Sequence, residues 1–205
     1  MNHNIVKKTK EKYLEYEQRE QEILNAAINL FNEKGYRATT TADISRAAGI
    51  SEPTMYKHFE NKAALFMECF RLIIDQLLGV YHEIYINNRD DEVAYLENVA
   101  IAYFDFVQKN PNKSKFLIHL LSYQDEQEFD NAFNEFIEGS IERIARVLDS
   151  AKRKGNVVSD IDIRLSAAWF VSQYFTVISM AQFVDKDKFT SENIVPLVKR
   201  VLGIN

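Results

Sequence analysis

The stretch that decides the fold spans residues 39–65 and reads TTTADISRAAGISEPTMYKHFENKAAL. Thr40 precedes Asp43 by three residues, the spacing of a capping box, in which each side chain accepts a hydrogen bond from the other residue's backbone amide. An apolar stripe follows, and Gly49 then stands where a left-handed residue ends a helix at low steric cost. These features predict a helix from Thr40 to about Ala48.

A second short helix is predicted directly after that turn. Ser51 is a good N-cap, and Pro53 falls in the first turn, where its missing N–H removes no helical hydrogen bond. Met55 and Phe59 are four residues apart and share the inward face. The outward face is then left to four hydrogen-bond donors: Thr54, Tyr56, Lys57 and His58.

The residues before this pair predict a third helix and an extension. An apolar stripe through Ile23, Ala27 and Phe31 indicates a helix that ends at Gly35. Residues 1–16 are polar and lack the apolar run of a signal peptide, so we expect a flexible extension. An arm laid along DNA is the alternative for this extension.

The TetR family of bacterial transcriptional regulators has a DNA-binding domain that resembles the run GYRATTTADISRAAGIS and the EPTMYKHFENKAAL that follows it. The resemblance covers roughly residues 18–65 and implies an all-α fold of about nine helices. After the expected flexible extension (1–16), it implies a three-helix helix-turn-helix domain (17–65) and a larger helical ligand-binding and dimerisation domain (66–205). Six glycines and three prolines, most of them where helices start or stop, agree with an all-α chain.

The resemblance also implies which residues meet DNA. A helix-turn-helix places its second helix in the major groove of a double-stranded operator, with flanking donors on phosphates. The positions implied at bases are Pro53, Thr54 and Lys57. The positions implied at phosphates are Thr41, Ser51, Tyr56, His58 and Lys62.

Glu52 departs from the family pattern, in which many members carry a basic residue at this position. A carboxylate there repels phosphate unless it accepts a hydrogen bond from a cytosine amino group. Alternatively, Glu52 only favours the positive end of its helix. Both interpretations stay open, and Glu52 counts among the candidate DNA contacts.

The charge is unevenly distributed along the 205 residues. Residues 1–65 hold 10 Lys or Arg and 9 Asp or Glu, whereas residues 66–205 hold 15 and 21, and the net charge is −5. Non-specific attraction to DNA is therefore expected to be modest, and tight binding is expected to need a matched operator and to weaken steeply with salt. The single cysteine excludes an internal disulfide and fits a cytoplasmic protein.

Further helices are predicted over residues 62–86, 92–109, 111–123, 125–154, 162–184 and 191–202. The stretch from Leu165 to Val184 has no charged residue and is apolar around most of its circumference. Its serines, threonines and glutamines argue against a membrane span, so it is expected in a core or at a subunit interface. The resemblance favours a homodimer interface, which predicts a palindromic operator. The expected interface residues are Ala167, Phe170, Tyr174, Ile178, Ala181, Val198 and Leu202.

Aromatic residues are abundant in the C-terminal part, and most are expected in the core. The resemblance implies a cavity for a small effector, and this sparsely charged inventory suits an apolar or amphipathic one. Effector binding would favour a second angle of the helix that starts near Lys62, and Gly79 there either lends flexibility or permits a close helix contact. The candidate cavity residues are His82, Tyr103, Phe116, His119, Phe136, Arg143, Trp169 and Gln173.

Catalytic and metal signatures are missing from the sequence. The four histidines are scattered, and no metal-ligand spacing, nucleophile elbow or phosphate-cradling glycine loop occurs. We therefore expect no enzyme, no metal and no cofactor. The main prediction is a repressor that an effector releases from its operator. The alternatives are a DNA-bound factor that acts outside transcription, on the nucleoid or in division, and a small-molecule-binding helical protein without DNA activity.

Overall fold

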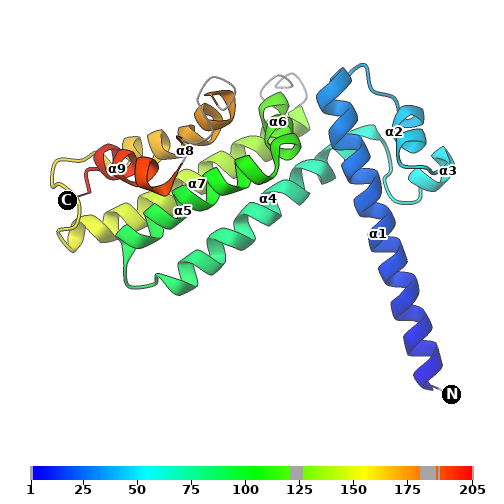
Figure 1. The fold of residues 1–205 in the computed structure, drawn as a ribbon, viewed down its shortest axis with the longest axis horizontal. Helices are drawn as coiled ribbons and strands as arrows, with labels where there is room; N and C mark the ends of the chain where they lie inside the picture. The colour runs from blue at the N-terminus through cyan, green and yellow to red at the C-terminus, as the bar shows by residue number, and fades with distance from the viewer. Residues whose placement is uncertain (1, 121–126, 181–187, 189, 205) are drawn as a thin grey trace. The chain divides into compact units, whose positions relative to one another are not determined.

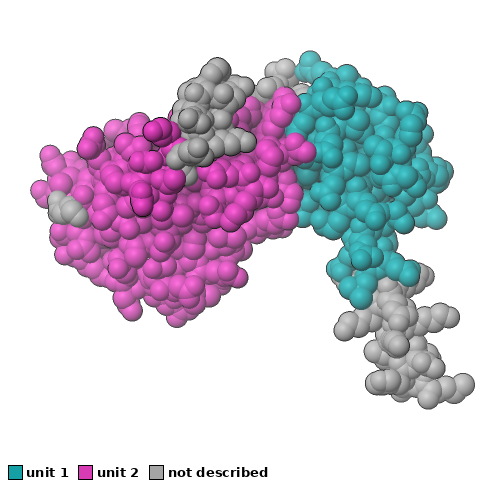
Figure 2. Space-filling model, viewed as in Figure 1, with its two compact units in different colours: residues 1–73 teal, residues 74–205 magenta. Residues whose placement is uncertain are grey.

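The structure is a computed structural model that describes residues 2–120, 127–180, 188 and 190–204. The described residues form the predicted all-α fold, with one isolated β-bridge between Val157 and Ile204 (Figure 1). The chain divides into two units, residues 1–73 and 74–205 (Figure 2). None of the described helices is long and apolar enough to cross a membrane.

The first unit is built from α1 (Asn2–Lys34), α2 (Thr41–Ala47), α3 (Glu52–Met55) and the first turns of α4 (Lys62–Asn87). Its core is the predicted apolar face of α1, covered by side chains of the other helices, among them Ile44 and Met55. Phe66 packs edge to face on Phe31 and Tyr36, with ring centroids 5.0 and 4.9 Å away. These contacts join α4 to α1 and to the loop that follows it.

The first helix is longer than the sequence analysis expected. Residues 2–16, for which we predicted a flexible extension, continue α1, which begins at Asn2. The reason is local, because no glycine or proline occurs before Gly35 and so no residue of this segment ends a helix.

The second unit contains the rest of α4 together with α5 (Glu92–Lys109), α6 (Pro111–Leu120), α7 (Gln127–Arg153), α8 (Ile163–Met180) and α9 (Ser191–Leu202). The bounds of α5 and α9 are the predicted ones. The predicted end of α6 at Tyr123, start of α7 at Asp125 and end of α8 at Val184 lie outside the described residues. The boundary between the units falls inside α4, further along the chain than the predicted boundary after Leu65.

α8 is apolar around most of its circumference, yet its two faces have different surroundings. Phe170, Val171 and Tyr174 are buried, and the Tyr103 hydroxyl donates to the Tyr174 carbonyl at 2.5 Å, which joins α5 to α8. On the other face Leu165 is 66% exposed and Trp169 is 48% exposed. The interior of one chain therefore covers only part of the apolar surface of α8.

Gly79 lies within α4, and of its two predicted roles the packing role is wrong. A Cβ atom built on Gly79 would meet no atom within 4 Å, so none of the helices that the structure describes needs the missing side chain. Its effect on helix flexibility stays a prediction.

Candidate nucleic-acid interface

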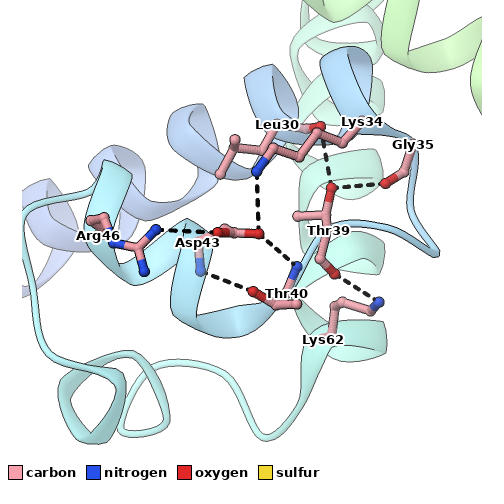
Figure 3. Close-up of polar contacts among 8 residues, drawn as sticks. All are labelled: Leu30, Lys34, Gly35, Thr39, Thr40, Asp43, Arg46 and Lys62. Atoms are coloured by element: carbon pink, nitrogen blue, oxygen red, sulfur yellow. Dashed lines mark hydrogen bonds and ion pairs between the residues drawn. The ribbon is translucent and has the colours of Figure 1, made fainter.

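The start of α2 is held by the predicted capping box. Thr40 Oγ1 accepts a hydrogen bond from the Asp43 amide at 3.1 Å, and the Asp43 carboxylate accepts one from the Thr40 amide at 3.4 Å (Figure 3). Lys34 and Arg46 each approach the same carboxylate to 3.3 Å. The hydrogen bond to the Thr40 side chain, and then the one to Lys34, lower the pKa of Asp43. The carboxylate therefore connects α2 to the end of α1.

Lys62 is used differently from the predicted phosphate contact. Its ammonium donates to the carbonyl oxygens of Tyr36 and Thr39, both at 2.9 Å, and lies 4.4 Å from the centroid of the Tyr36 ring. Thr39 is fully buried, and its hydroxyl donates to the Gly35 carbonyl at 2.7 Å (Figure 3). Lys62 therefore fastens the loop between α1 and α2 to the start of α4, and its charge is satisfied by protein atoms.

Ser51 is the N-cap of α3, as predicted. Ser51 Oγ accepts from the Thr54 amide at 3.3 Å and lies 2.8 Å from the Thr54 hydroxyl oxygen, within hydrogen-bonding distance. Pro53 is exposed in the first turn, whereas Met55 and Phe59 are buried. The predicted inward face of this segment is confirmed.

Three of the predicted DNA-facing residues form one hydrogen-bond chain between α2 and α3. The Tyr56 hydroxyl donates to Thr41 Oγ1 at 3.2 Å, and the Thr41 hydroxyl donates to Glu52 Oε1 at 2.7 Å. Glu52 lies in the first turn of α3, where a carboxylate favours the positive helix end. Its bond to Thr41 was not predicted. These two hydrogen bonds connect α2 to α3. They lie at the protein surface, where Tyr56 is 49% exposed.

Lys57 and His58 are neighbours in sequence but have different surroundings. Lys57 is exposed, whereas the His58 side chain is 6% exposed and stacks on Tyr16, with ring centroids 4.1 Å apart. The predicted outward orientation of His58 is therefore wrong, because α1 covers this position. Burial lowers the pKa of His58, although Glu20, 4.0 Å from Nδ1, acts in the opposite direction.

Tyr16 belongs to this surface, and the sequence analysis missed it. It lies on α1 in a segment that we expected to be a flexible extension, and its hydroxyl donates to the Lys57 carbonyl at 3.4 Å. The four-residue spacing of Tyr16 and Glu20 places both on one face of α1, but no local pattern shows that His58 packs on that face.

The predicted ligand residues do not converge on one place. In the second unit, a cavity of about 610 Å³ is lined in part by His82 and Arg143. A smaller cavity of about 190 Å³ is lined in part by Tyr103, Trp169 and Gln173. Of the described residues predicted to touch ligand, three line neither cavity: Phe116, His119 and Phe136.

Most of the predicted dimer-interface residues are interior residues of a single chain. Ala167, Phe170, Tyr174 and Leu202 are all less than 9% exposed, so their side chains already have neighbours within the chain. Ile178 and Val198 are partly exposed. Ala181 lies outside the described residues. The exposed large apolar residues of α8 and α9 are Leu165, Trp169 and Leu197.

Comparison with known proteins agrees with the geometry of α2 and α3. The family described as "Bacterial regulatory proteins, tetR family" matches residues 23–69. The HTH-type transcriptional repressor KstR2 of Rhodococcus jostii is 30% identical over 176 residues, which cover 77% of this chain and 79% of that protein. The nucleoid occlusion factor SlmA of Actinobacillus pleuropneumoniae is 30% identical over 150 residues, which cover 70% of this chain and 71% of that protein.

Solved structures share the fold along almost the whole chain. The transcriptional regulator FadR of Bacillus subtilis, crystallised in complex with stearoyl-CoA, superposes with a TM-score of 0.69 at 19% identity. The superposition covers 89% of this chain and 95% of that one.

The capped helix pair and the helical second unit define a DNA-binding transcriptional regulator. The extent and identity of the match to KstR2, together with the family match over the helix-turn-helix, show that the chain belongs to the TetR family of bacterial regulatory proteins. Transcriptional regulators of this family are not enzymes, so the chain is a DNA-binding regulator and not an enzyme.

Proposed function

We propose that this protein is a repressor that binds a palindromic operator as a homodimer and leaves it when a small effector binds the second unit. The observation that carries the proposal is the surface of α3, where Pro53 and Lys57 are exposed beside the hydrogen-bond chain from Tyr56 through Thr41 to Glu52. A helix held rigidly on its neighbour, with donors on its free face, fits the major groove. The protein then acts in the cytoplasm, where its operator lies.

The DNA contacts of this proposal are fewer than the sequence suggested. Pro53, Thr54 and Lys57 meet bases, and Thr41, Ser51 and Tyr56 meet phosphates. The side chains of His58 and Lys62 are left out, because the protein itself surrounds or satisfies them. Glu52 orients Thr41 through their hydrogen bond, and its acceptance of a cytosine amino group stays a prediction.

Fluorescence anisotropy with a labelled promoter fragment tests this surface. We expect Tyr56→Ala combined with Lys57→Ala to weaken binding by about tenfold or more and to flatten its salt dependence. Arg71→Ala is the control, since Arg71 is an exposed cation of α4 with no predicted DNA contact. An unchanged affinity in a double variant with a native circular dichroism spectrum would refute the proposed interface.

For the dimer, we propose a contact through the exposed face of α8 and α9. Leu165, Trp169 and Leu197 are large, apolar and exposed there, and the small apolar cavity between α5, α8 and α9 lies beside two of them. Large apolar side chains gathered on one face are typical of subunit interfaces. Sedimentation velocity should show a dimer that Leu165→Glu with Leu197→Glu converts to monomer. Val158→Glu, an equally apolar exposed site outside both helices, should stay dimeric.

The effector is proposed to bind in the second unit, as the complex of FadR with stearoyl-CoA suggests for a protein of the same fold. Binding shifts the population only if the effector prefers one conformation of α4 over the other. Mass spectrometry of small molecules that co-purify with the native protein, followed by operator-release assays, identifies it. Release by none of the recovered molecules would leave a DNA-binding protein without this regulation.

The similarity to a nucleoid occlusion factor supports one alternative function, that of a nucleoid-associated DNA-binding factor. A repressor occupies few promoters, often including its own, whereas a nucleoid-associated factor occupies many dispersed sites. Genome-wide occupancy separates the two, and dispersed occupancy far from promoters would overturn the repressor proposal.

A further inference from the structure

The larger cavity of the second unit lies between two helix faces and the start of α5. α4 and α7 each supply residues at positions i, i+3, i+4 and i+7, the spacing of one helical face. We call it the α4–α7 cavity, and its volume of about 610 Å³ is ordinary for a small-molecule site. The lining residues that matter here are Tyr81 and Tyr85 on α4, Arg89 in the turn after α4, Tyr95 on α5, and Arg143 and Arg146 on α7.

The α4–α7 cavity is cationic although the unit that contains it is acidic. Residues 74–205 hold 14 Lys or Arg and 20 Asp or Glu. The cavity lining, by contrast, includes Arg89, Arg143 and Arg146, and a single acid, Glu92. The local excess of positive charge therefore arises because the fold brings these three arginines together.

Glu92 does little to offset that charge, because it already has partners. Lys154 Nζ lies 2.7 Å from its carboxylate, and the Ser150 hydroxyl donates to Oε1 at 2.7 Å. Burial raises the pKa of Glu92, but the hydrogen bonds from Lys154 and Ser150 outweigh it and leave the pKa lowered. The Glu92 carboxylate is thus ionised and paired with Lys154. It therefore does not neutralise the arginines that line the cavity.

Arg143 and Arg146 have no acidic partner among the residues that the structure describes. Two other arginines of this unit, Arg153 and Arg164, do pair, with Asp149 and Glu138 respectively. Guanidinium groups recognise carboxylates, sulfonates and phosphates through paired, charge-assisted hydrogen bonds. Two unpaired ones, a single turn apart on one helix face, are therefore suited to hold one acidic group.

Three tyrosines also line the cavity: Tyr81, Tyr85 and Tyr95. Tyr81 is 4% exposed, and within the described residues its hydroxyl has no hydrogen bond of normal geometry, although Tyr174 lies beside it. The rings of Tyr85 and Tyr95 meet edge to face, with centroids 6.0 Å apart. Aromatic walls of this kind pack well on a flat ring, and a buried hydroxyl supplies one further polar contact.

We infer that the α4–α7 cavity binds an organic anion with a flat aromatic body. Its acidic group lies against Arg143 and Arg146, and its ring lies against the tyrosines of α4 and α5. This narrows the apolar or amphipathic effector that the sequence suggested. Naming this anion the effector rests on the proposed function, whereas its binding to the cavity does not.

Two fluorescent probes that differ only in the acidic group test the inference on the full chain. Anilinonaphthalene sulfonate carries a sulfonate, and phenylnaphthylamine has the same ring system without it. We expect Arg143→Gln with Arg146→Gln to weaken sulfonate binding by about tenfold or more, since each lost bond is to a charged group. Binding of the neutral probe should change by less than about twofold. Arg153→Gln, which removes a paired charge outside the cavity on the same helix, should change neither.

The outcomes decide the inference without reference to DNA. An equal loss for both probes, or no loss for the sulfonate, would overturn the role of the arginines. Naphthalene sulfonate should displace the bound probe and ethanesulfonate should not, and displacement by both would overturn the aromatic half. Because no operator is present, a failure of the proposed function leaves these titrations unchanged. Conversely, a normal operator affinity in the double variant leaves the proposed function intact whatever the probes do.

Discussion

Replacing Lys62 by methionine separates its two possible roles, as a structural contact and as a DNA contact. Methionine keeps an unbranched side chain of similar length but removes the ammonium group. In the structure that group donates to the Tyr36 and Thr39 carbonyls at 2.9 Å each and lies over the Tyr36 ring. Thr39 is fully buried and Tyr36 is 8% exposed, so little water can replace the lost donor.

The expected cost follows from those contacts. A hydrogen bond to a charged group contributes about 1.5–3 kcal/mol, and the contact with the ring adds about 0.5–1 kcal/mol. Two bonds to one ammonium are not additive, so we expect Lys62→Met to lower the free energy of unfolding by about 3 kcal/mol. With a urea dependence of about 1–3 kcal/mol per molar, the midpoint falls by about 1–3 M.

Urea unfolding followed by far-ultraviolet circular dichroism measures this loss. The fluorescence of Trp169, the only tryptophan, reports on the second unit, whose transition should stay unchanged. Lys57→Met is the matched control, because Lys57 is exposed. It should unfold within about 0.5 kcal/mol of the unmodified protein while its operator binding weakens. If Lys62→Met unfolds like the unmodified protein and loses operator affinity like Lys57→Met, the ammonium serves DNA and our assignment is refuted.

Acidification should destabilise the first unit, because burial holds the pKa of His58 below its ordinary value of 6.5. Stability is then full above about pH 6.5 and is lost as the pH falls through the lowered pKa, so the urea midpoint should drop less in His58→Asn than in the unmodified protein. Equal drops would contradict this. Thermal unfolding should show Gly79→Ala stabilised by about 0.5–1 kcal/mol, since its Cβ meets no atom within 4 Å. Gly203→Ala should lose more than about 1 kcal/mol, because its φ is +62° and its Cβ would lie 2.7 Å from Val158 Cγ2. Equal shifts for the two glycines would refute the argument.

Local signals in the sequence predicted α2 and α3 and where these two helices begin. The capping box at Thr40, the N-cap at Ser51 and the left-handed Gly49 each depend on residues no more than four positions apart. Interactions over such short distances along the chain depend only on neighbouring residues, so the sequence predicts them without knowledge of the tertiary structure. The same holds for the inward face of α3, which Met55 and Phe59 mark by their spacing.

The candidate site was predictable in its residue types but not in its orientations. The resemblance implies that Lys62 and His58 face DNA. In the structure, however, the loop after α1 accepts the hydrogen bonds of Lys62, and Tyr16 of α1 stacks on His58. Which side of a residue a distant segment covers depends on tertiary packing, and no local pattern records it. Tyr16 was missed for the same reason.

By itself, the sequence determined the all-α class, the helix-turn-helix and the starts of its helices, because each rests on short-range hydrogen bonding and helical period. Tertiary structure alone decided which face of α8 is buried, since a helix that is apolar around most of its circumference has no clear hydrophobic period to distinguish its faces. It also decided that Arg143 and Arg146 share a cavity with tyrosines of α4, because helices far apart in the chain meet only in the folded unit.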